Sequence, residues 1–207
     1  TQALELYAEA KSAYEAAGAT SSPNYAGLLK AMGTAHCNQR RNTQALELYA
    51  EAKSAYEAAS ATSSPDYAGL LRCMGTAHGK QGRITQALEL FAEAKSAYEA
   101  AGATSSPNYA GLLKAMGTAH SKQGRNTQAL ELYAEAKSAY EAAGATSSPD
   151  YADLLMSIGV VHRQQGRSTQ ALELYAEAKS AYQAAGATSS PGYASLLASM
   201  GSAHNQR

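Results

Sequence analysis

The sequence has no excess of charge of either sign and no long apolar run. Among its 207 residues, 17 are basic and 17 are acidic, and the isoelectric point is about 6.9. A neutral chain has no general attraction to nucleic acid or to an anionic membrane, so neither is expected as a partner. Although 45% of the residues are hydrophobic, no 18 consecutive residues are apolar, so no segment is predicted to span a bilayer.

Motifs for catalysis and metal binding are also lacking. The chain contains no phosphate-binding G-x-x-x-x-G-K-[ST] loop, no H-E-x-x-H zinc motif and no G-x-S-x-G nucleophile motif. Its only two cysteines, Cys37 and Cys73, do not form the regular pattern of a disulfide framework. Free thiols are typical of a reducing compartment, so the protein is expected to be cytoplasmic. We expect no enzymatic activity, no cofactor and no metal ion.

What the sequence does contain is a unit of 42 residues, present in five near-identical copies. The copies begin at Thr1, Thr43, Thr85, Thr127 and Thr169, and each opens with TQALEL(Y/F)AEAKSAY. A fixed period of this length is typical of a solenoid, in which each unit packs only against its neighbours. We therefore predict one repeat domain over residues 1–207. The start within a repeat and the missing initiator methionine predict that the chain is a piece of a longer array.

Each unit has the pattern of two helices. The first, helix A, begins at a pair such as Ser64-Pro65, because serine caps a helix and proline fits its first position. Its apolar residues follow at three- and four-residue steps until the turn at Gly82. The second, helix B, is predicted to begin near Thr85 as its cap and to end at Gly102. The five copies predict ten antiparallel helices, with an unpaired helix B first and an unpaired helix A last.

The unit resembles the tetratricopeptide repeat. Six residues stand at the spacings of that family: Leu71, Gly75, Gly82, Ala87, Phe91 and Ala94. The resemblance implies that small residues let the two helices approach closely and that Phe91 fills the gap above them. The 42-residue period and the SSP(N/D)YA start look like the variant found in kinesin light chains and in the C-terminal arrays of NB-ARC-type NTPase receptors. The resemblance implies an all-α, right-handed superhelix of antiparallel helix pairs that binds proteins.

Helix B hardly varies between the copies, whereas helix A varies strongly. Two of the seventeen positions from Thr1 to Ala17 change, compared with ten of the seventeen from Pro23 to Gln39. Even the helix B positions that are expected to be exposed and free to change stay constant; they are headed by Gln2, Glu5, Glu9 and Lys11. The changing positions of helix A fall on one side of the helix at about 100° per residue. This pattern indicates a recognition surface that has diversified on a constant frame.

In tetratricopeptide arrays the changing side of helix A lines the concave groove, so the resemblance implies that these residues bind the ligand. The predicted ligand-binding residues are Gly27, Lys30, Thr34, Cys37, Gly69, Arg72, Thr76, Lys114, Thr118, Ser121, Asp153, Met156, Val160, Arg163, Ala198 and Ser202. One end of the groove would carry three cations beside three hydroxyls. The other would carry Met156, Val160 and an Asp153/Arg163 pair. We predict a protein or peptide ligand with acidic residues at one end and an apolar patch at the other.

Other interpretations stay open. The chain could be a structural spacer, or an engineered repeat scaffold with no native ligand, in which the lysines and threonines of helix A form an ordinary solvated surface. The histidines occupy one repeat position on the packing face: His36, His78, His120, His162 and His204. No second ligand recurs four residues later, so they are predicted to be packing residues and not a zinc site.

Neither end of the sequence has a polar capping helix, which open solenoids generally need. Each end should therefore expose an apolar face. We predict head-to-tail self-association, in which residues 1–18 of one chain complete the repeat begun at residues 191–207 of another.

Overall fold

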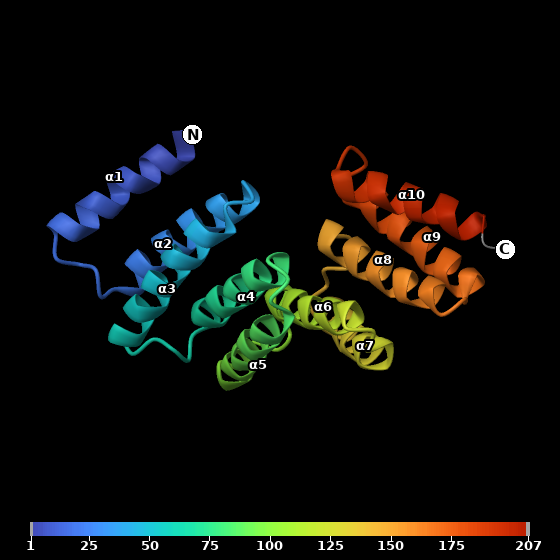
Figure 1. Cartoon of the computed structure of the whole chain (residues 1–207), viewed down its shortest axis with the longest axis horizontal. Helices are drawn as coiled ribbons and strands as arrows, with labels where there is room; N and C mark the ends of the chain where they lie inside the picture. The colour runs from blue at the N-terminus through green and yellow to red at the C-terminus, as the bar shows by residue number, and fades with distance from the viewer. Residues whose placement is uncertain (1, 206–207) are drawn as a thin grey trace. The chain divides into compact units, whose positions relative to one another are not determined.

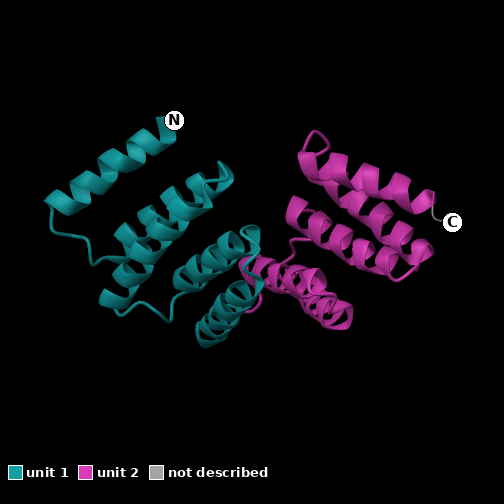
Figure 2. Ribbon diagram, viewed as in Figure 1, with its two compact units in different colours: residues 1–103 teal, residues 104–207 magenta. Residues whose placement is uncertain are grey.

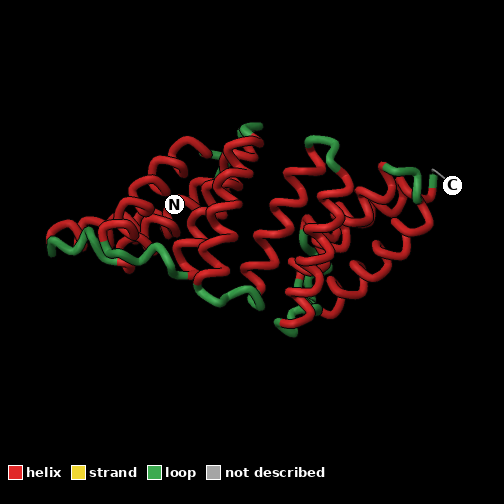
Figure 3. The backbone as a smooth tube through the Cα atoms, turned by 90° about the horizontal axis from the view of Figure 1, so that it is seen from below, coloured by secondary structure: helices red, strands yellow, loops and turns green. Residues whose placement is uncertain are grey.

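The computed structural model describes residues 2–205, and the regular structure in this range is entirely helical (Figure 1). Ten α-helices joined by short loops, and no strand, are found within it (Figure 3). The predicted all-α repeat solenoid is therefore confirmed. Thr1, the predicted start of the first copy, lies outside the described residues.

The chain divides into two compact units, residues 1–103 and residues 104–207 (Figure 2). The first unit contains α1 (Gln2–Ala16), α2 (Pro23–Asn38), α3 (Asn42–Ala58), α4 (Pro65–Lys80) and α5 (Ile84–Ala100). The second unit contains α6 (Pro107–Lys122), α7 (Asn126–Ala142), α8 (Pro149–Gln164), α9 (Ser168–Ala184) and α10 (Pro191–His204). The even-numbered helices are the predicted A helices and the odd-numbered helices are the predicted B helices.

The A helices begin where the sequence predicts. In α4, Pro65 occupies the first turn, and the Ser64 side chain accepts a hydrogen bond from the Tyr67 N–H at 3.2 Å. The same serine cap precedes α2, α6, α8 and α10. Each cap satisfies one of the N–H groups that have no partner inside the helix. One local signal in the sequence therefore fixes the start of every helix A.

The B helices α3, α5, α7 and α9 begin slightly earlier than predicted and lack the predicted cap. In α5 the N-cap is Arg83, which makes no side-chain capping hydrogen bond, and the helix starts at Ile84. The prediction that Thr85 caps the helix is therefore wrong. The reason is the tight turn before it: the Arg83 N–H closes the end of α4 on the His78 carbonyl, and the Arg83 carbonyl already accepts the first bond of α5. No room remains for Thr85 outside the helix.

The B helices end as predicted, in a left-handed residue. Gly102 has φ +64°, and the Ala103 N–H then bonds the Tyr98 carbonyl at 3.0 Å. Glycine adopts this conformation without steric cost. The second copy departs from this pattern, because Ser60 takes the positive φ of 53° where the other copies carry glycine. In the turn that follows helix A, Arg40 likewise takes a φ of 62° where other copies carry glycine.

Each helix A packs most extensively against the helix B that follows it, from α2 with α3 to α8 with α9. In the pair α4–α5, a Cβ placed on Gly75 would lie 2.5 Å from the Phe91 ring and 3.0 Å from the Ala87 carbonyl oxygen. Phe91 is only 3% exposed and Ala87 is fully buried. The predicted close approach at Gly75, with Phe91 filling the gap, is therefore confirmed. Gly33, Gly117 and Gly159 lie in the same way against tyrosine rings.

Gly75→Ala should destabilise the protein by about 1–3 kcal/mol, because the added methyl group has no space beneath the Phe91 ring. The free energy of unfolding in urea measures this loss. Gly27→Ala is the matched control, since a Cβ on this helical glycine would meet nothing within 4 Å. The control should be neutral or stabilising by up to about 1 kcal/mol. Equal effects of the two variants would contradict the packing described above.

Arg40→Gly and Ser60→Gly should each stabilise the protein by about 0.5–1 kcal/mol. Removing the Cβ relieves the left-handed strain of about 1–2 kcal/mol, which the higher chain entropy of glycine partly offsets. The midpoint of urea unfolding reports the gain. Arg41→Gly is the control, because Arg41 has φ −90° and no strain to relieve. A loss of stability in Arg40→Gly and Ser60→Gly would show that the side chains compensate for their backbone.

Candidate functional site

All sixteen predicted ligand-binding residues lie on A helices, and thirteen of them are half-buried. Cys37 is buried, whereas Ala198 and Ser202 are exposed. The half-burial has a common cause, because consecutive A helices within a unit lie side by side: α2 beside α4, and α8 beside both α6 and α10. Within each unit, this arrangement brings predicted residues of neighbouring repeats together on what we call the helix A surface.

Two of the three predicted cations contact carboxylates of the next helix A. The Lys30 ammonium lies 3.2 Å from an oxygen of Asp66, and the Lys114 ammonium lies 3.8 Å from oxygens of both Asp150 and Asp153. The two lysine side chains keep 25% and 21% of their exposure. Their charges are thus partly neutralised within the chain, which reduces their attraction for an acidic ligand.

The sequence carried a signal for these pairs that our sequence analysis missed. An aspartate follows Lys30 and Lys114 by 36 residues. The same repeat position is Asn108 in the third copy and Gly192 in the fifth, where the preceding copy has arginine or methionine instead of lysine. A comparison that takes one repeat position at a time across the five copies does not reveal such a pairing between two positions in neighbouring copies.

The arginines of the helix A surface contact hydroxyl groups of B helices. The Arg72 guanidinium lies beside the Tyr98 hydroxyl, and the Arg163 guanidinium lies beside the Tyr175 hydroxyl. Burial raises the pKa of both tyrosines, although the neighbouring guanidinium groups oppose the shift, so the hydroxyls stay neutral. Asp153 faces the lysine described above, and the members of the predicted Asp153/Arg163 pair therefore have separate partners.

A cavity of about 250 Å³ lies between α6, α7 and α8 in the second unit. Its lining residues are Thr118, Ser121, Lys122, Tyr133, Met156, Ser157, Val160 and Gln164. Four of them are residues that the sequence predicts: Thr118, Ser121, Met156 and Val160. The sequence analysis missed Lys122, Ser157 and Gln164, although these also occupy changing positions of helix A, and it missed Tyr133 because that position is constant.

Three of the hydroxyl groups that line this cavity are already hydrogen-bonded. Thr118 donates to the Lys114 carbonyl at 2.9 Å, so the Tyr133 hydroxyl, 3.1 Å away, donates to Thr118. Ser157 donates to the Asp153 carbonyl at 2.8 Å and lies beside the Tyr133 hydroxyl. Burial raises the pKa of Tyr133 and keeps it neutral. The cavity therefore has a fixed polar part beside an apolar wall.

The equivalent surface of the first unit has a different chemistry. The two positions of the apolar wall hold Arg72 and Thr76 in place of methionine and valine. The Lys80 ammonium donates a hydrogen bond to the buried Cys37 sulfur at 3.3 Å, which joins α4 to α2 across this surface. One repeat frame therefore displays a cationic surface in one unit and a partly apolar one in the other.

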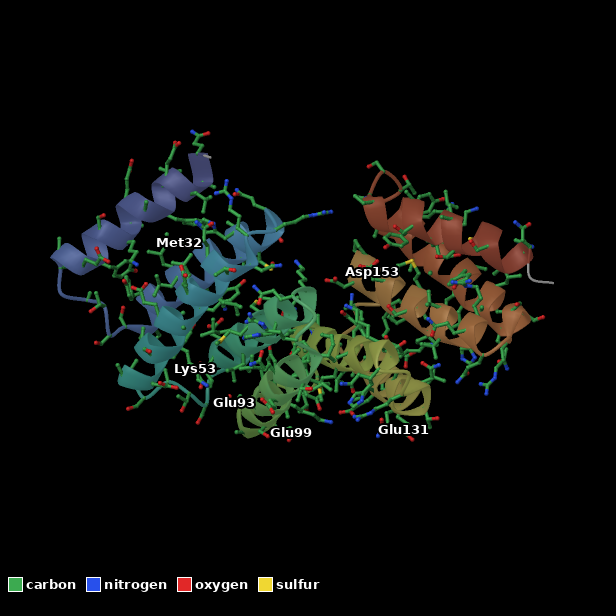
Figure 4. The ribbon with its side chains drawn as sticks, in the orientation of Figure 1. Met32, Lys53, Glu93, Glu99, Glu131 and Asp153 are labelled. Atoms are coloured by element: carbon green, nitrogen blue, oxygen red, sulfur yellow. The ribbon has the colours of Figure 1, made fainter. Side chains whose placement is uncertain are left out.

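Constant side chains of helix B form a polar network between neighbouring repeats. The Lys53 ammonium lies 3.1 Å from a carboxylate oxygen of Glu93, and both residues are labelled in Figure 4. The Tyr67 hydroxyl donates a hydrogen bond to the same carboxylate at 3.0 Å. Burial raises the pKa of Tyr67, and the Glu93 carboxylate raises it further, so this hydroxyl keeps its proton. The same Lys–Glu–Tyr network recurs as Lys11–Glu51–Tyr25 and as Lys137–Glu177–Tyr151.

This Lys–Glu–Tyr network corrects the interpretation of helix B. The positions headed by Glu9 and Lys11 are not free to change, because each lysine pairs with the glutamate of the next copy. The glutamine position headed by Gln2 also has a partner, since Gln86 hydrogen-bonds His78. Packing between repeats therefore explains much of the constancy of helix B without any ligand.

Four of the histidines are half-buried, whereas His204 is exposed, and three of the half-buried ones have a lowered pKa. Burial lowers the pKa of His78, Arg83 lowers it further, and the hydrogen bond with Gln86 opposes the shift. Burial also lowers the pKa of His120 and His162. The Nδ1 atoms of these three side chains are buried and have no hydrogen-bond partner in the part of the chain that the structure describes. Among residues 2–205, no group of three or more potential ligand side chains could hold a metal ion.

The stability of the protein should fall between pH 7 and pH 5. The folded pKa of each shifted histidine lies below its usual value of 6.5, so the unfolded chain binds protons first as the pH falls. The stabilisation by these neutral histidines is complete above pH 6.5 and is lost as the pH approaches the folded pKa values. Thermal unfolding across this range measures the slope.

A chain in which His78, His120 and His162 are all replaced by glutamine serves as the control for this pH dependence. Its melting temperature should vary less between pH 5 and pH 7 than that of the parent chain, whatever its absolute stability. An unchanged slope would mean that other groups cause the pH dependence.

Two tetratricopeptide repeat family models match the chain, one over residues 66–142 and the other over residues 114–187. Together they span residues 66–187, which is more than half of the 207 residues. A comparison with curated protein sequences finds no match. No helix among residues 2–205 combines the length and the apolar character that crossing a membrane requires.

Several solved structures share the fold at low sequence identity. BtubC (BKLC) from P. vanneervenii is 15% identical, with a TM-score of 0.70, and the match covers 99% of this chain and 89% of that one. A putative kinesin light chain with nearly identical TPR-like repeats, from Podosopora anserina, is 12% identical, with a TM-score of 0.71 and coverage of 89% and 87%. The Rap conjugation gene regulator of the plasmid pLS20, solved in complex with a peptide, is 16% identical, with a TM-score of 0.63 and coverage of 74% and 41%.

Proposed function

Because the chain belongs to the tetratricopeptide repeat family, we propose that it is a scaffold that binds a protein or peptide on its helix A surface. Repeats of this family generally mediate interactions between proteins. The observation that carries the proposal is the cavity of the second unit, where seven changing residues of two repeats come together. The Rap regulator supports it, since a protein of the same fold holds a peptide.

The cavity favours an apolar side chain of the ligand. Met156 and Val160 form the apolar part of its wall, and a buried aliphatic side chain contributes about 1.5–3 kcal/mol to binding. Lys122 and Gln164 are exposed beside it and can bind a carboxylate or the peptide backbone. A ligand with an apolar residue next to acidic or backbone acceptors therefore fits this surface best.

The proposed preference for acidic residues depends mainly on Arg72 in the first unit. Lys30 and Lys114 already contact aspartates, so an acidic ligand would have to compete for them. Arg72 contacts a neutral hydroxyl instead, and its Nε atom is buried without a hydrogen-bond partner among the described residues. We propose that a ligand carboxylate binds at this guanidinium group.

The alternative is a structural spacer or an engineered scaffold that has no ligand. It is supported by the Lys–Glu–Tyr network, which explains constant surface positions through stacking alone. A spacer needs no cavity, and its changing positions would be interchangeable between copies. The two proposals therefore differ in whether exchanging these residues between copies changes any binding.

Exchanging residues between copies provides the test. A peptide library displayed on phage is first selected against the folded chain, and binding of the selected peptide is measured by calorimetry. Met156→Lys combined with Val160→Thr installs the residues that the first and third copies carry, so the fold should be unaffected. Binding should weaken at least about 10-fold, which corresponds to about 1.4 kcal/mol of lost apolar burial.

The matched control makes the same kind of change outside the cavity, with Ala198→Lys and Ser202→Thr in α10. Its affinity should equal that of the parent chain. Arg72→Ala should weaken only those peptides that contain acidic residues. Failure to select any peptide, or equal affinities of the cavity variant and its control, would favour the spacer.

The second proposed partner is another copy of the same chain. The large apolar side chains exposed in the described part of the chain are Leu6 in the first helix and Leu197 in the last. They lie on a helix B and a helix A, which are the two types that pair within a repeat. Their exposure supports head-to-tail association.

A further inference from the structure

Within the chain, each helix A that is followed by a helix B has its apolar face covered by that helix. The pair α8–α9 is an example, since Leu155 and Tyr175 are both fully buried. A Cβ placed on Gly159 would collide with the Tyr175 ring, so this ring lies directly on the backbone of α8. The pair provides a template for any contact between the two types of helix.

The last helix, α10, presents the same face uncovered. Leu197, the equivalent of Leu155, is 44% exposed. A Cβ placed on Gly201, the equivalent of Gly159, would meet nothing within 4 Å. The space above the glycine that the Tyr175 ring fills on α8 is therefore unoccupied by this chain on α10.

The first helix, α1, carries the side chains that fill such a space. Residues 2–14 of α1 are identical to residues 170–182 of α9. In α9, Tyr175 and Ala171 are fully buried, whereas in α1 the equivalent Tyr7 is half-buried and Ala3 is exposed. Leu6 on the same helix is 59% exposed. Each terminal helix therefore exposes one half of a contact that the chain makes elsewhere.

The members of one further Lys–Glu–Tyr network are also divided between the two ends of the chain. The Lys–Glu–Tyr network joins α7, α9 and α8 through one residue of each helix. Its next members would be Lys179 on α9, Tyr193 on α10 and Glu9 on α1. In the described part of the chain, Lys179 and Glu9 make no ion pair, and the Tyr193 hydroxyl makes no hydrogen bond. The two ends thus carry complementary charges that lack a partner.

We propose that α1 of a second copy of this chain docks on α10 as α9 docks on α8. Tyr7 would then lie over Gly201, and Glu9 would lie between Lys179 and Tyr193. This inference rests on the self-association proposed above and specifies its residues and its register. It applies to the 207-residue chain, because a further repeat joined to either end would cover the same faces.

The contact is heterologous, since it joins two different surfaces. A pair of copies formed in this way still has one free α1 and one free α10, so further copies can add until a ring closes. A symmetric contact, α1 with α1 or α10 with α10, would stop at a dimer. The two possibilities give different results when variants are mixed.

The first experiment measures sedimentation of the intact chain over a range of concentrations. The parent chain should form oligomers larger than dimers as its concentration rises. Gly201→Ala should weaken association at least about 10-fold, since the methyl group would occupy the place of the Tyr7 ring, as on Gly159. The monomer should keep its fold, because nothing lies near this position and alanine favours helix. Gly27→Ala, a helical glycine away from both ends, should associate like the parent chain.

The second experiment mixes two variants that are each monomeric alone. Gly201→Ala keeps an intact α1, and Tyr7→Ala keeps an intact α10. Mixed in equal amounts, they should form a one-to-one dimer that grows no further. Circular dichroism confirms that α1 remains helical in Tyr7→Ala.

A parent chain that stays monomeric at every concentration would overturn both self-association and this register. If the parent chain associates but the mixed variants stay monomeric, the chain self-associates by another contact and the register alone is wrong. The peptide-binding proposal is judged separately, because the Met156→Lys/Val160→Thr variant leaves α1 and α10 unchanged and should associate like the parent chain.

Discussion

The contact between an aromatic ring and a glycine holds each helix pair together. In four pairs a Tyr or Phe ring of helix B lies on a glycine of helix A, and the rings are at most 3% exposed. Burying such a ring contributes about 1.5–3 kcal/mol, which is large beside the net stability of a small domain. The contact requires glycine, because any side chain would hold the helices apart. The glycine is constant, whereas the sequence of helix A varies around the contact, for example at Thr34 and Thr118, which hydrogen-bond the hydroxyls of two of these rings.

Apolar packing and the polar network have different roles in this arrangement. The Lys–Glu–Tyr network lies at partly exposed positions, where one ion pair is worth about 0–1 kcal/mol. Such a network adds little stability compared with the buried rings. It does set the alignment of one repeat on the next, since each lysine meets a glutamate 40 residues later. The rings therefore stabilise the pairs, and the network specifies how the pairs stack.

The features that could be predicted are those encoded within a few neighbouring residues. The serine caps at Ser22 and Ser64 follow from local spacing and were correct, and the ring over Gly75, which the family resemblance implied, was also correct. The cap at Thr85 was wrong because it depends on how tightly the preceding turn closes. The contact of Lys30 with Asp66 on the next helix A could not be predicted from either repeat position alone, because it depends on the distance between two helices.

The candidate site could likewise be predicted only as far as local sequence allows. Met156 and Val160 could be identified as changed residues, but their place beside Tyr133 depends on the volumes of side chains from three helices. The constant Tyr133 gave no signal of its own, and Lys122 was missed although its position changes. Variation between copies thus pointed to residues of the A helices, four of which line this cavity. Only the coordinates show which residues share one cavity.

The repetition of the Lys–Glu–Tyr network has a consequence for how such a gene can evolve. Because every lysine finds an identical glutamate in whichever unit comes next, the loss or duplication of one whole unit breaks no pairing. Unequal crossing-over between the near-identical segments would therefore yield arrays of different length that still fold. Each such event also brings different helix A surfaces next to one another, so that a change in length creates a new combination of changing residues.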